Sequence, residues 1–281
     1  MAAGKARRVI GLGAAGAALG GALLLGGRRM SADREIARRI RALTPPPSKD
    51  RFDPRSVADQ PEPVRRYFLH ALAEGAPLDA AVRLSMRGQI RLGVEGAWKR
   101  MRAEEIVAPP RGFVWRVWAG EGLMRMTGAD WLEGGSAGVR FFALGVVPVA
   151  HASGFDVDRS AAGRLALESI WAPAALLPER GVRWEVEGPD AIRASLRIAG
   201  EPHSFTLGLD DAGRVRSVTG LRWGSLVENE PHAWIPFGAD VDDERTFNGV
   251  TIPSAVRVAW WHGTARVFEF FRAEVEVLPL G

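Results

Sequence analysis

The second half of the chain contains one strongly helical stretch, Gly154-Phe-Asp-Val-Asp-Arg-Ser-Ala-Ala-Gly-Arg-Leu-Ala-Leu-Glu-Ser-Ile-Trp-Ala-Pro-Ala-Ala-Leu-Leu-Pro178. Small apolar residues recur in it at helical spacing, and Pro173 and Pro178 interrupt the chain at its end. The pattern predicts a helix that is capped by Asp158 and ends near Trp171. A helical face of small side chains can approach a flat surface closely, so we expect it to pack on a β-sheet.

Charged side chains lie beside the apolar positions of this helix. Arg164 and Glu168 are four residues apart and can pair on one helical face. With Asp156, Asp158 and Arg159 they are candidate ligand-binding residues around a site. The alternative is a capped helix with ordinary surface ion pairs, which contribute little to stability.

On both sides of this helix the apolar residues alternate with polar ones. Val82, Leu84 and Met86, for example, alternate with Arg83 and Ser85. Asn248-Gly249, between two such segments, is a strong hairpin signal. We predict a mainly β (α+β) protein with roughly ten to twelve antiparallel strands. The sheet is expected to form a curved half-barrel, with the helix across its concave side.

The aromatic residues suggest that some strands are apolar on both faces. Trp260 and Trp261 are adjacent, as are Phe141 and Phe142, and neighbouring residues in a strand point to opposite faces. If one face is core, the other needs a second apolar environment, such as a ligand cavity, a lipid or a partner. The aromatic candidates for ligand binding are Trp115, Trp118, Trp131, Phe142, Trp171 and Trp260.

Composition narrows the class of protein. The chain has 281 residues, 47% of them hydrophobic and 25% charged, as in an ordinary globular protein. It has no cysteine, which excludes disulfides and thiolate metal sites. Residues 1–60 carry 12 Lys and Arg against 5 Asp and Glu, whereas residues 61–281 carry 25 against 28. Because the body is slightly acidic, we expect no nucleic-acid binding.

The N-terminal segment predicts a membrane attachment. Residues 9–27 carry no charge and lie between basic residues, so residues 1–30 are read as a transmembrane anchor or signal segment. A charged helix and a Pro-rich linker occupy residues 31–58, and a single β-rich domain occupies residues 59–281, opening with a capping box at Asp59 to Glu62. The basic residues after the segment outnumber those before it, which on charge alone favours a cytoplasmic body. The order of a basic and then an apolar region resembles an export signal instead, so we expect an inner-membrane protein whose body is extracytoplasmic.

Several short motifs match catalytic patterns without their structural context. Gly11 to Gly16 matches a dinucleotide fingerprint but lacks the strand–helix–strand unit around it. Gly134-Gly-Ser-Ala-Gly138 matches a nucleophile elbow, but a strand-like segment follows it, so a hairpin loop is expected. The five histidines have no metal-ligand spacing. The carboxylates Asp240, Asp242 and Glu244 fit no calcium-loop pattern and are read as a solvated face. We therefore predict no catalytic residue, metal or cofactor.

Several segments resemble a bacterial family of uncharacterised proteins that is classed only as a domain of unknown function. The resemblance covers roughly residues 60–275 and implies no catalytic residue. Its implied shape is similar to that of the lipoprotein-carrier half-barrels. The segments are Pro61-Glu-Pro-Val-Arg-Arg-Tyr67, Ala108-Pro-Pro-Arg-Gly-Phe-Val-Trp115, Gly154 to Arg164, Pro173-Ala-Ala-Leu-Leu-Pro178 and Phe270-Phe-Arg272.

Three functions remain open. The leading hypothesis is a membrane-anchored, non-enzymatic protein that holds an apolar ligand or lipid in the half-barrel. The second is a structural domain that binds a partner at the membrane. The third is a hydrolase using His151 with Asp156 or Asp158.

Overall fold

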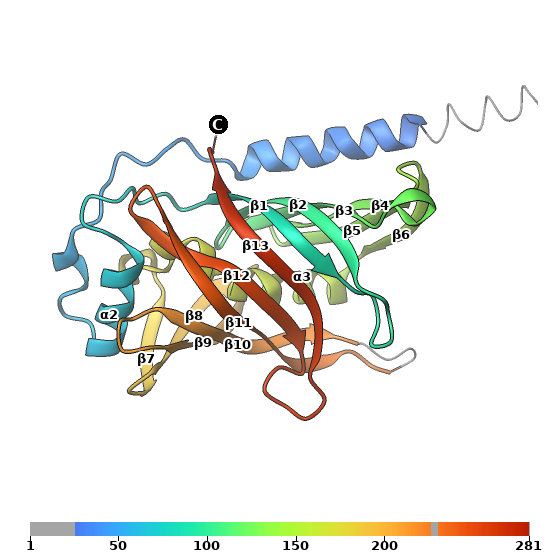
Figure 1. Ribbon diagram of the computed structural model, residues 1–281. Helices are drawn as coiled ribbons and strands as arrows, with labels where there is room; N and C mark the ends of the chain where they lie inside the picture. Colours follow the sequence, from blue (N-terminus) through green and yellow to red (C-terminus); the bar gives the residue numbers. More distant parts are fainter. Residues whose placement is uncertain (1–25, 226–229, 281) are drawn as a thin grey trace, which may run out of the picture.

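The computed structural model describes residues 26–225 and 230–280. Within these residues the chain forms one thirteen-stranded antiparallel sheet, with the strand order β6-β5-β4-β3-β2-β1-β13-β12-β11-β10-β9-β8-β7 (Figure 1). The strands are β1 (Val82–Ile90), β2 (Lys99–Ala108), β3 (Gly112–Ala119), β4 (Met126–Glu133), β5 (Ser136–Ala143), β6 (Val147–Ser153), β7 (Arg183–Gly188), β8 (Ala191–Ile198), β9 (Glu201–Leu209), β10 (Val215–Gly224), β11 (Ala233–Phe247), β12 (Val250–Trp260) and β13 (Phe268–Leu278).

The sheet consists of two meanders that are joined in the middle. Within β1–β6 and within β7–β13 each strand pairs with its neighbour in sequence, and β1 pairs with β13 along Arg83 to Ile90. The predicted hairpin turn at Asn248-Gly249 is confirmed, since it links β11 to β12 and both residues have a positive φ. The predicted mainly β, curved antiparallel half-barrel is therefore confirmed. The described residues form thirteen strands rather than ten to twelve.

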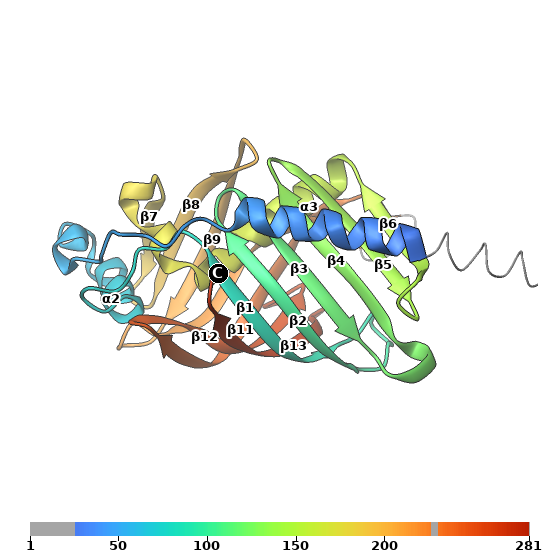
Figure 2. The same cartoon turned by 90° about the horizontal axis from the view of Figure 1, so that it is seen from above.

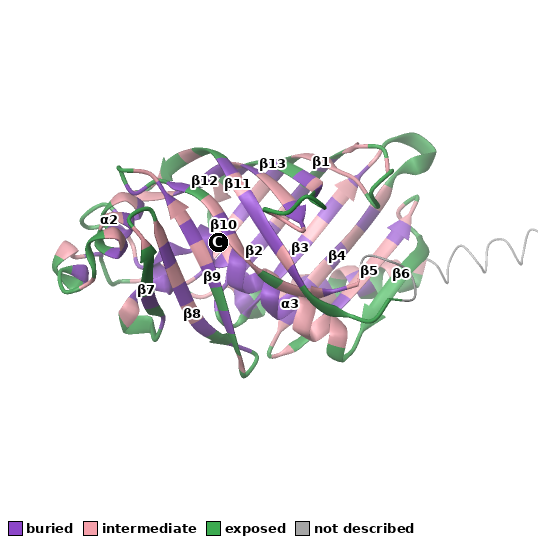
Figure 3. Cartoon of the chain, turned by 90° about the horizontal axis from the view of Figure 1, so that it is seen from below, coloured by how far each residue is buried: buried purple, intermediate pink, exposed green. Residues whose placement is uncertain are grey.

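The strand β6 did not stand out in the sequence. Every residue from Val147 to Ser153 is exposed, so this edge strand has no buried face that would impose an alternating pattern. Figure 3 shows β6 as an exposed ribbon, whereas the buried residues lie on α3 and on the strands around it.

The predicted helix crosses the concave side of the sheet. The helix α3 (Phe155–Glu168) continues into three short 3₁₀ turns, η3 (Ser169–Trp171), η4 (Pro173–Leu176) and η5 (Pro178–Arg180). This segment connects β6 to β7, which are the two outer edges of the sheet, so the chain has to cross the concavity (Figures 1 and 3). Its small face lies directly on the sheet, since a Cβ on Gly163 would be in van der Waals contact with the β10 backbone at 3.5 Å.

Two predicted helix caps are wrong. The residue that caps α3 is Gly154, with φ of 107°, and Asp158 instead accepts a hydrogen bond from the Ala137 backbone N–H at 2.6 Å. The helix α2 (Glu62–Ala71) begins after Pro61 without a side-chain cap, so Asp59 forms no capping box. In both cases the helix begins at a different residue from the one that the pattern favours.

The residues before β1 close one end of the half-barrel. The 3₁₀ turn η1 (Pro54–Val57) precedes α2, and Phe52 and Val57 are buried in the main core although they lie in the predicted linker. Tyr67 and Phe68 of α2 pack against Trp184 of β7, with ring centroids 5.6 and 5.5 Å apart. The globular part therefore begins before residue 59.

A helix over residues 26–43 lies along the convex face of the sheet (Figure 2). Ile36 and Leu43 are buried against Ile106, Val114 and Trp131 of β2, β3 and β4. A second, smaller core therefore lies on the convex face, and it explains why these strands are apolar on both sides.

One further 3₁₀ turn lies at a strand connection, and the predicted membrane segment lies almost wholly outside the described residues. The 3₁₀ turn η2 (Gly122–Met124) lies in the β3–β4 connection. The predicted transmembrane segment, residues 9–27, lies outside the described residues except for Gly26 and Gly27. Within residues 26–225 and 230–280, no helix is both long and apolar enough to cross a bilayer.

Candidate functional site

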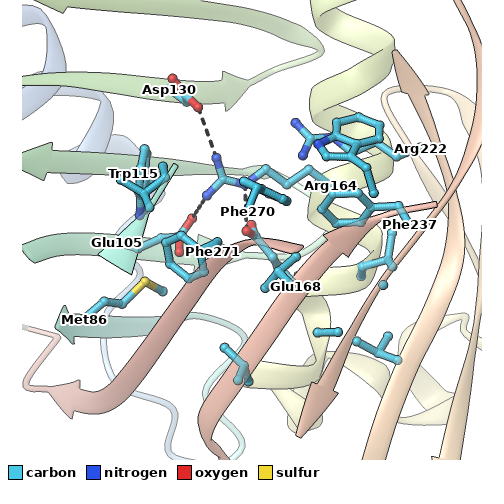
Figure 4. Close-up of a pocket in the computed structure, with 18 of the residues that line it drawn as sticks. Met86, Glu105, Trp115, Asp130, Arg164, Glu168, Arg222, Phe237, Phe270 and Phe271 are labelled. Carbon is cyan, nitrogen blue, oxygen red and sulfur yellow. Dashed lines mark hydrogen bonds and ion pairs between the residues drawn. The ribbon is translucent and has the colours of Figure 1, made fainter. Parts of the chain in front are cut away.

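A cavity of about 310 Å³ lies between α3 and the concave face of the sheet. Its walls are mostly apolar and come from both halves of the sheet, which suits the usual construction of small-molecule sites. The apolar lining includes Met86, Trp115, Phe141, Leu167, Trp171, Val256, Trp260, Phe270 and Phe271. Figure 4 shows Met86, Trp115, Phe270 and Phe271 around one part of this space.

One group of charged side chains also lines the cavity, and Arg164 is at its centre. The Arg164 guanidinium lies 2.8 Å from Glu105, 3.3 Å from Asp130 and 2.6 Å from Glu168 (Figure 4). It also lies over the rings of Phe113 and Trp115, 4.4 and 5.3 Å from their centroids. Arg164 therefore has partners on α3 and on the three strands β2, β3 and β4.

The register of the strands produces this arrangement. Glu105 pairs with Trp115 across β2 and β3, and Trp115 pairs with Asp130 across β3 and β4. The three side chains therefore form one row on the concave face. Arg164 and Glu168 are four residues apart on α3, so both can face that row.

The cluster is short of hydrogen-bond donors. Three buried oxygens, Glu105 Oε2, Asp130 Oδ1 and Glu168 Oε2, have no partner among the described residues. Burial, and then the negative charge of Glu168, raise the pKa of Glu105 well above its usual 4.5 despite the nearby Arg164. Burial also raises the pKa of Asp130. The site therefore favours a neutral, protonated carboxyl at Glu105.

Arg222 on β10 is a second cation at the cavity wall, and its environment is different. Its guanidinium lies 5.0 Å from the Phe237 centroid and 4.9 Å from the Trp260 centroid. Its Nε donates to the carbonyl and hydroxyl oxygens of Ser160 at 3.3 Å. Burial, together with the positive charge of Arg164, lowers the pKa of Arg222 to about 10. No described carboxylate forms an ion pair with it.

Five of the residues proposed from the sequence line this cavity: Trp115, Arg164, Glu168, Trp171 and Trp260. Trp171 is held by a hydrogen bond from its indole N–H to the Pro253 carbonyl at 3.1 Å. Of the adjacent pair Trp260-Trp261, Trp260 points into the cavity, and Trp261 stacks with Arg266 at the end of the strand.

Three of the aromatic candidates belong to the convex face. Trp131 lies under Arg39 of the N-terminal helix, 4.9 Å from its centroid, and Phe142 lies under Arg29 at 5.0 Å. Trp118 stacks with Arg102 and Arg116. The structure does not bring these three rings to the cavity, and Phe141 rather than Phe142 faces it.

The three candidates at the start of α3 lie at the edge of the concavity. Asp156 accepts a hydrogen bond from the Trp223 indole N–H at 2.8 Å and lies 3.8 Å from His232. Arg159 pairs with Glu201 and stacks with Trp223. A smaller cavity of about 200 Å³ lies beside Asp156, and Arg164 and Arg222 line it as well as the larger one.

Sequence reasoning missed Glu105, Asp130 and Arg222. Glu105 and Asp130 stand at inward positions of strands whose inward residues are otherwise apolar, and that break in alternation is a detectable signal. Nothing in the local sequence around Arg222 indicates that it lines a cavity.

The catalytic motifs are not assembled into a site. Ser136 is the first residue of β5, after a tight turn at Gly134-Gly135, so the hairpin prediction is confirmed. His151 is exposed on β6, and the histidine beside Asp156 is His232. Asp240 and Asp242 pair with Arg257. Among residues 26–225 and 230–280, no three His, Cys, Asp or Glu side chains form a group that can hold a metal ion.

The geometry defines an open antiparallel half-barrel with an internal cavity of ligand size. The chain belongs to the Family of unknown function (DUF6544), whose model matches residues 50–273, and the resemblance seen in the sequence is thereby confirmed. No curated protein matches the sequence.

The solved structures that are similar to this chain include the following two. An outer membrane lipoprotein-sorting protein domain from Vibrio parahaemolyticus has a TM-score of 0.39 and 8% identity, and the match covers 71% of this chain and 84% of that one. A LolA superfamily protein from Nitrosomonas europaea has a TM-score of 0.35 and 10% identity, with 76% and 90% covered. Because both TM-scores are below 0.5, the half-barrel description rests on the sheet of this protein alone.

Proposed function

We propose that this protein is a membrane-anchored binding protein that holds an apolar or lipid ligand in its half-barrel. The observation that carries the proposal is the cavity under α3, whose walls come from both halves of the sheet and are mostly apolar. An apolar cavity between packed elements is the usual form of a small-molecule site.

The charged cluster favours a ligand that has a polar end. Arg164, Glu105, Asp130 and Glu168 line the same cavity as the apolar residues, and Arg222 lines it without an ion pair to any described carboxylate. Unpaired buried oxygens cost free energy, and a ligand that donates hydrogen bonds to them would recover part of it. An amphiphile, with a chain along the apolar wall and a polar group at the cluster, fits both parts of the lining.

The membrane attachment is part of the proposal. The uncharged residues 9–27 support an uncleaved anchor in the inner membrane, and the order of basic and apolar segments favours an extracytoplasmic body. Protease treatment of intact spheroplasts tests the orientation. Degradation of the body in intact spheroplasts is the expected result, and protection until lysis would contradict an extracytoplasmic location.

Native mass spectrometry of the full chain, released from detergent micelles, tests ligand binding. The expected result is a discrete extra mass that organic extraction removes, with the same compound identified in the extract. A chain that has only its own mass and takes up no added fatty acid or phospholipid would contradict the proposal.

Partner binding is a second candidate, and the edge strand β6 favours it. Every residue of β6 is exposed, and β6 pairs only with β5 among the described strands. An unpaired strand edge can add a strand from another chain. This function predicts association through β6, which Val149→Pro would abolish without affecting the extracted mass.

A further inference from the structure

Three neighbouring hairpin tips form one end of the sheet. The β1–β2, β3–β4 and β5–β6 connections lie at the same end because their strands pair in a simple meander. The registers Ile90–Lys99, Met101–Ala119 and Met126–Ala143 align the last residues of these strands. We call these three connections the hairpin rim.

The hairpin rim exposes apolar side chains at each tip. Leu123 and Met124 of η2 are 86% and 65% exposed, although both are large and apolar. The other two tips each expose a pair as well. The full set is Leu92 and Val94 at β1–β2, Leu123 and Met124 at β3–β4, and Leu144 and Val146 at β5–β6. Apolar side chains gathered on adjacent loops are typical of an interaction surface.

A basic groove lies beside these tips. It has a volume of about 570 Å³ and is lined by Arg29, Arg100, Arg102 and Arg125, with Glu121 as its one acidic residue. Arg125 forms no ion pair with a described carboxylate, and the Arg100–Glu121 pair is 4.0 Å apart and exposed. The groove therefore presents a net positive charge.

The N-terminal helix leads to the same place. Arg29, in its first described turn, donates a hydrogen bond to Thr127 of β4 at 2.6 Å and lies over Phe142 of β5. The uncharged residues 9–25 precede this turn directly in the sequence. A segment inserted in a membrane would therefore hold the hairpin rim next to the bilayer surface.

From these observations we infer that the hairpin rim and the basic groove form a docking surface for an anionic lipid bilayer. The exposed apolar side chains enter the interface, and the arginines contact lipid phosphates. Charge complementarity and the position of residue 26 favour a bilayer over a soluble partner. The inference does not require the cavity to hold a ligand.

Docking would also bring the cavity to the membrane. Leu92 belongs to the hairpin rim and also lines the cavity, together with Ile90 at the end of β1. This connection rests on the proposed function, and it gives an apolar ligand a short path between the bilayer and the cavity.

Single cysteines make the test direct, because the chain has none of its own. The full-length variants Leu123→Cys and Leu144→Cys, labelled with a polarity-sensitive nitrobenzoxadiazole dye, are reconstituted in vesicles of phosphatidylcholine with or without phosphatidylglycerol. Val186→Cys, an exposed apolar position on β7, is the control. A blue shift of both rim labels in the anionic vesicles, with no shift at Val186, is the expected result.

Replacing arginines separates docking of the hairpin rim from tethering by the N-terminal segment, because that segment is present in every variant. Arg100→Gln with Arg125→Gln should weaken the docking equilibrium about thirtyfold, as expected for two phosphate-contacting charges. Arg183→Gln with Arg197→Gln removes the same charge from exposed positions on β7 and β8 and should have no effect. Rim labels that show no blue shift, like the label at Val186, would overturn the inference. It would also be overturned if the rim labels shifted equally in neutral vesicles and in the variant that lacks both arginines.

Discussion

Arg164 is the residue on which the charged cluster depends. Its side chain is largely buried, and it is the one cation in contact with Glu105, Asp130 and Glu168 among the described residues. Burying a charged side chain is unfavourable unless it is paired with an opposite charge, so the loss of one side chain of the cluster leaves the others in an unfavourable environment. A pattern of charges on a helix indicates neither this burial nor the strand residues that complete the cluster.

Replacement of Arg164 by leucine should therefore be strongly destabilising. Arg164→Leu leaves carboxylates buried without a cation, which typically costs about 3–5 kcal/mol in the free energy of unfolding. Arg193→Leu breaks an exposed pair with Glu187 and should cost less than about 1 kcal/mol. Urea unfolding of the two variants measures the difference, and equal losses would contradict the assigned role.

Glu105 should make stability depend on pH. Its raised pKa means that the folded protein binds a proton that the unfolded chain releases above pH 4.5. The contribution of Glu105 is complete below that pH and decreases as the pH rises toward the folded-state pKa, by up to about 1.4 kcal/mol per pH unit.

Unfolding as a function of pH tests this assignment. Glu105→Gln should flatten the decline, although Asp130, whose pKa is also raised, leaves a smaller slope. The neighbouring Glu104→Gln, on the other face of β2, should keep the full slope. A decline that Glu105→Gln leaves unchanged would show that another group binds the proton.

At the scale of elements, the sequence predicted α3 and most strands because their periodicity is imposed by one-sided burial. Prediction from the sequence failed where both faces of a strand are buried, or where neither face is. Alternation alone places Phe141 and Phe142 on opposite faces, but it does not say which face is the cavity. The N-terminal helix resolves this, because it covers Phe142 and Trp131 on the convex side.

That helix should detach when its buried stripe is made polar. Ile36→Asp with Leu43→Asp removes the apolar contacts with β2, β3 and β4, and each such side chain contributes about 1.5–3 kcal/mol when buried. Tryptic cleavage at Arg38 and Arg39 should become at least tenfold faster, whereas Arg34→Asp, at an exposed position, should leave it unchanged. Equal cleavage rates would show that the helix is not held by this stripe.

At the scale of the whole molecule, the cavity exists because the chain must cross from one edge of the sheet to the other. The connection from β6 to β7 places α3 over the concave face, and the first 3₁₀ turn after it, η3, adds Ile170 and Trp171 to the cavity wall. The sequence predicted a helix over a curved sheet. The cavity residues contributed by distant strands, such as Glu105 and Phe237, depend on strand order and register, which no local pattern specifies.

Filling the cavity should abolish binding without unfolding the protein. Ala239→Phe places a ring in the cavity from β11, where Ala239 is buried and lines the space. The affinity of the Ala239→Phe variant for a fluorescent fatty acid should fall at least tenfold. Ala152→Phe, the same change at an exposed position of β6, should bind like the unaltered protein, and thermal melts establish that both variants are folded. Unchanged affinity in Ala239→Phe would place the ligand elsewhere.

The most direct test of the central claim is a cross-linking map of the full chain in vesicles that contain a diazirine-bearing fatty acid. After irradiation, mass spectrometry of the peptides locates the adducts. The proposed function predicts adducts on cavity residues such as Met86, Leu167 and Phe271, and their loss in Ala239→Phe. Adducts confined to the N-terminal segment and the hairpin rim would support membrane contact but contradict a ligand inside the half-barrel.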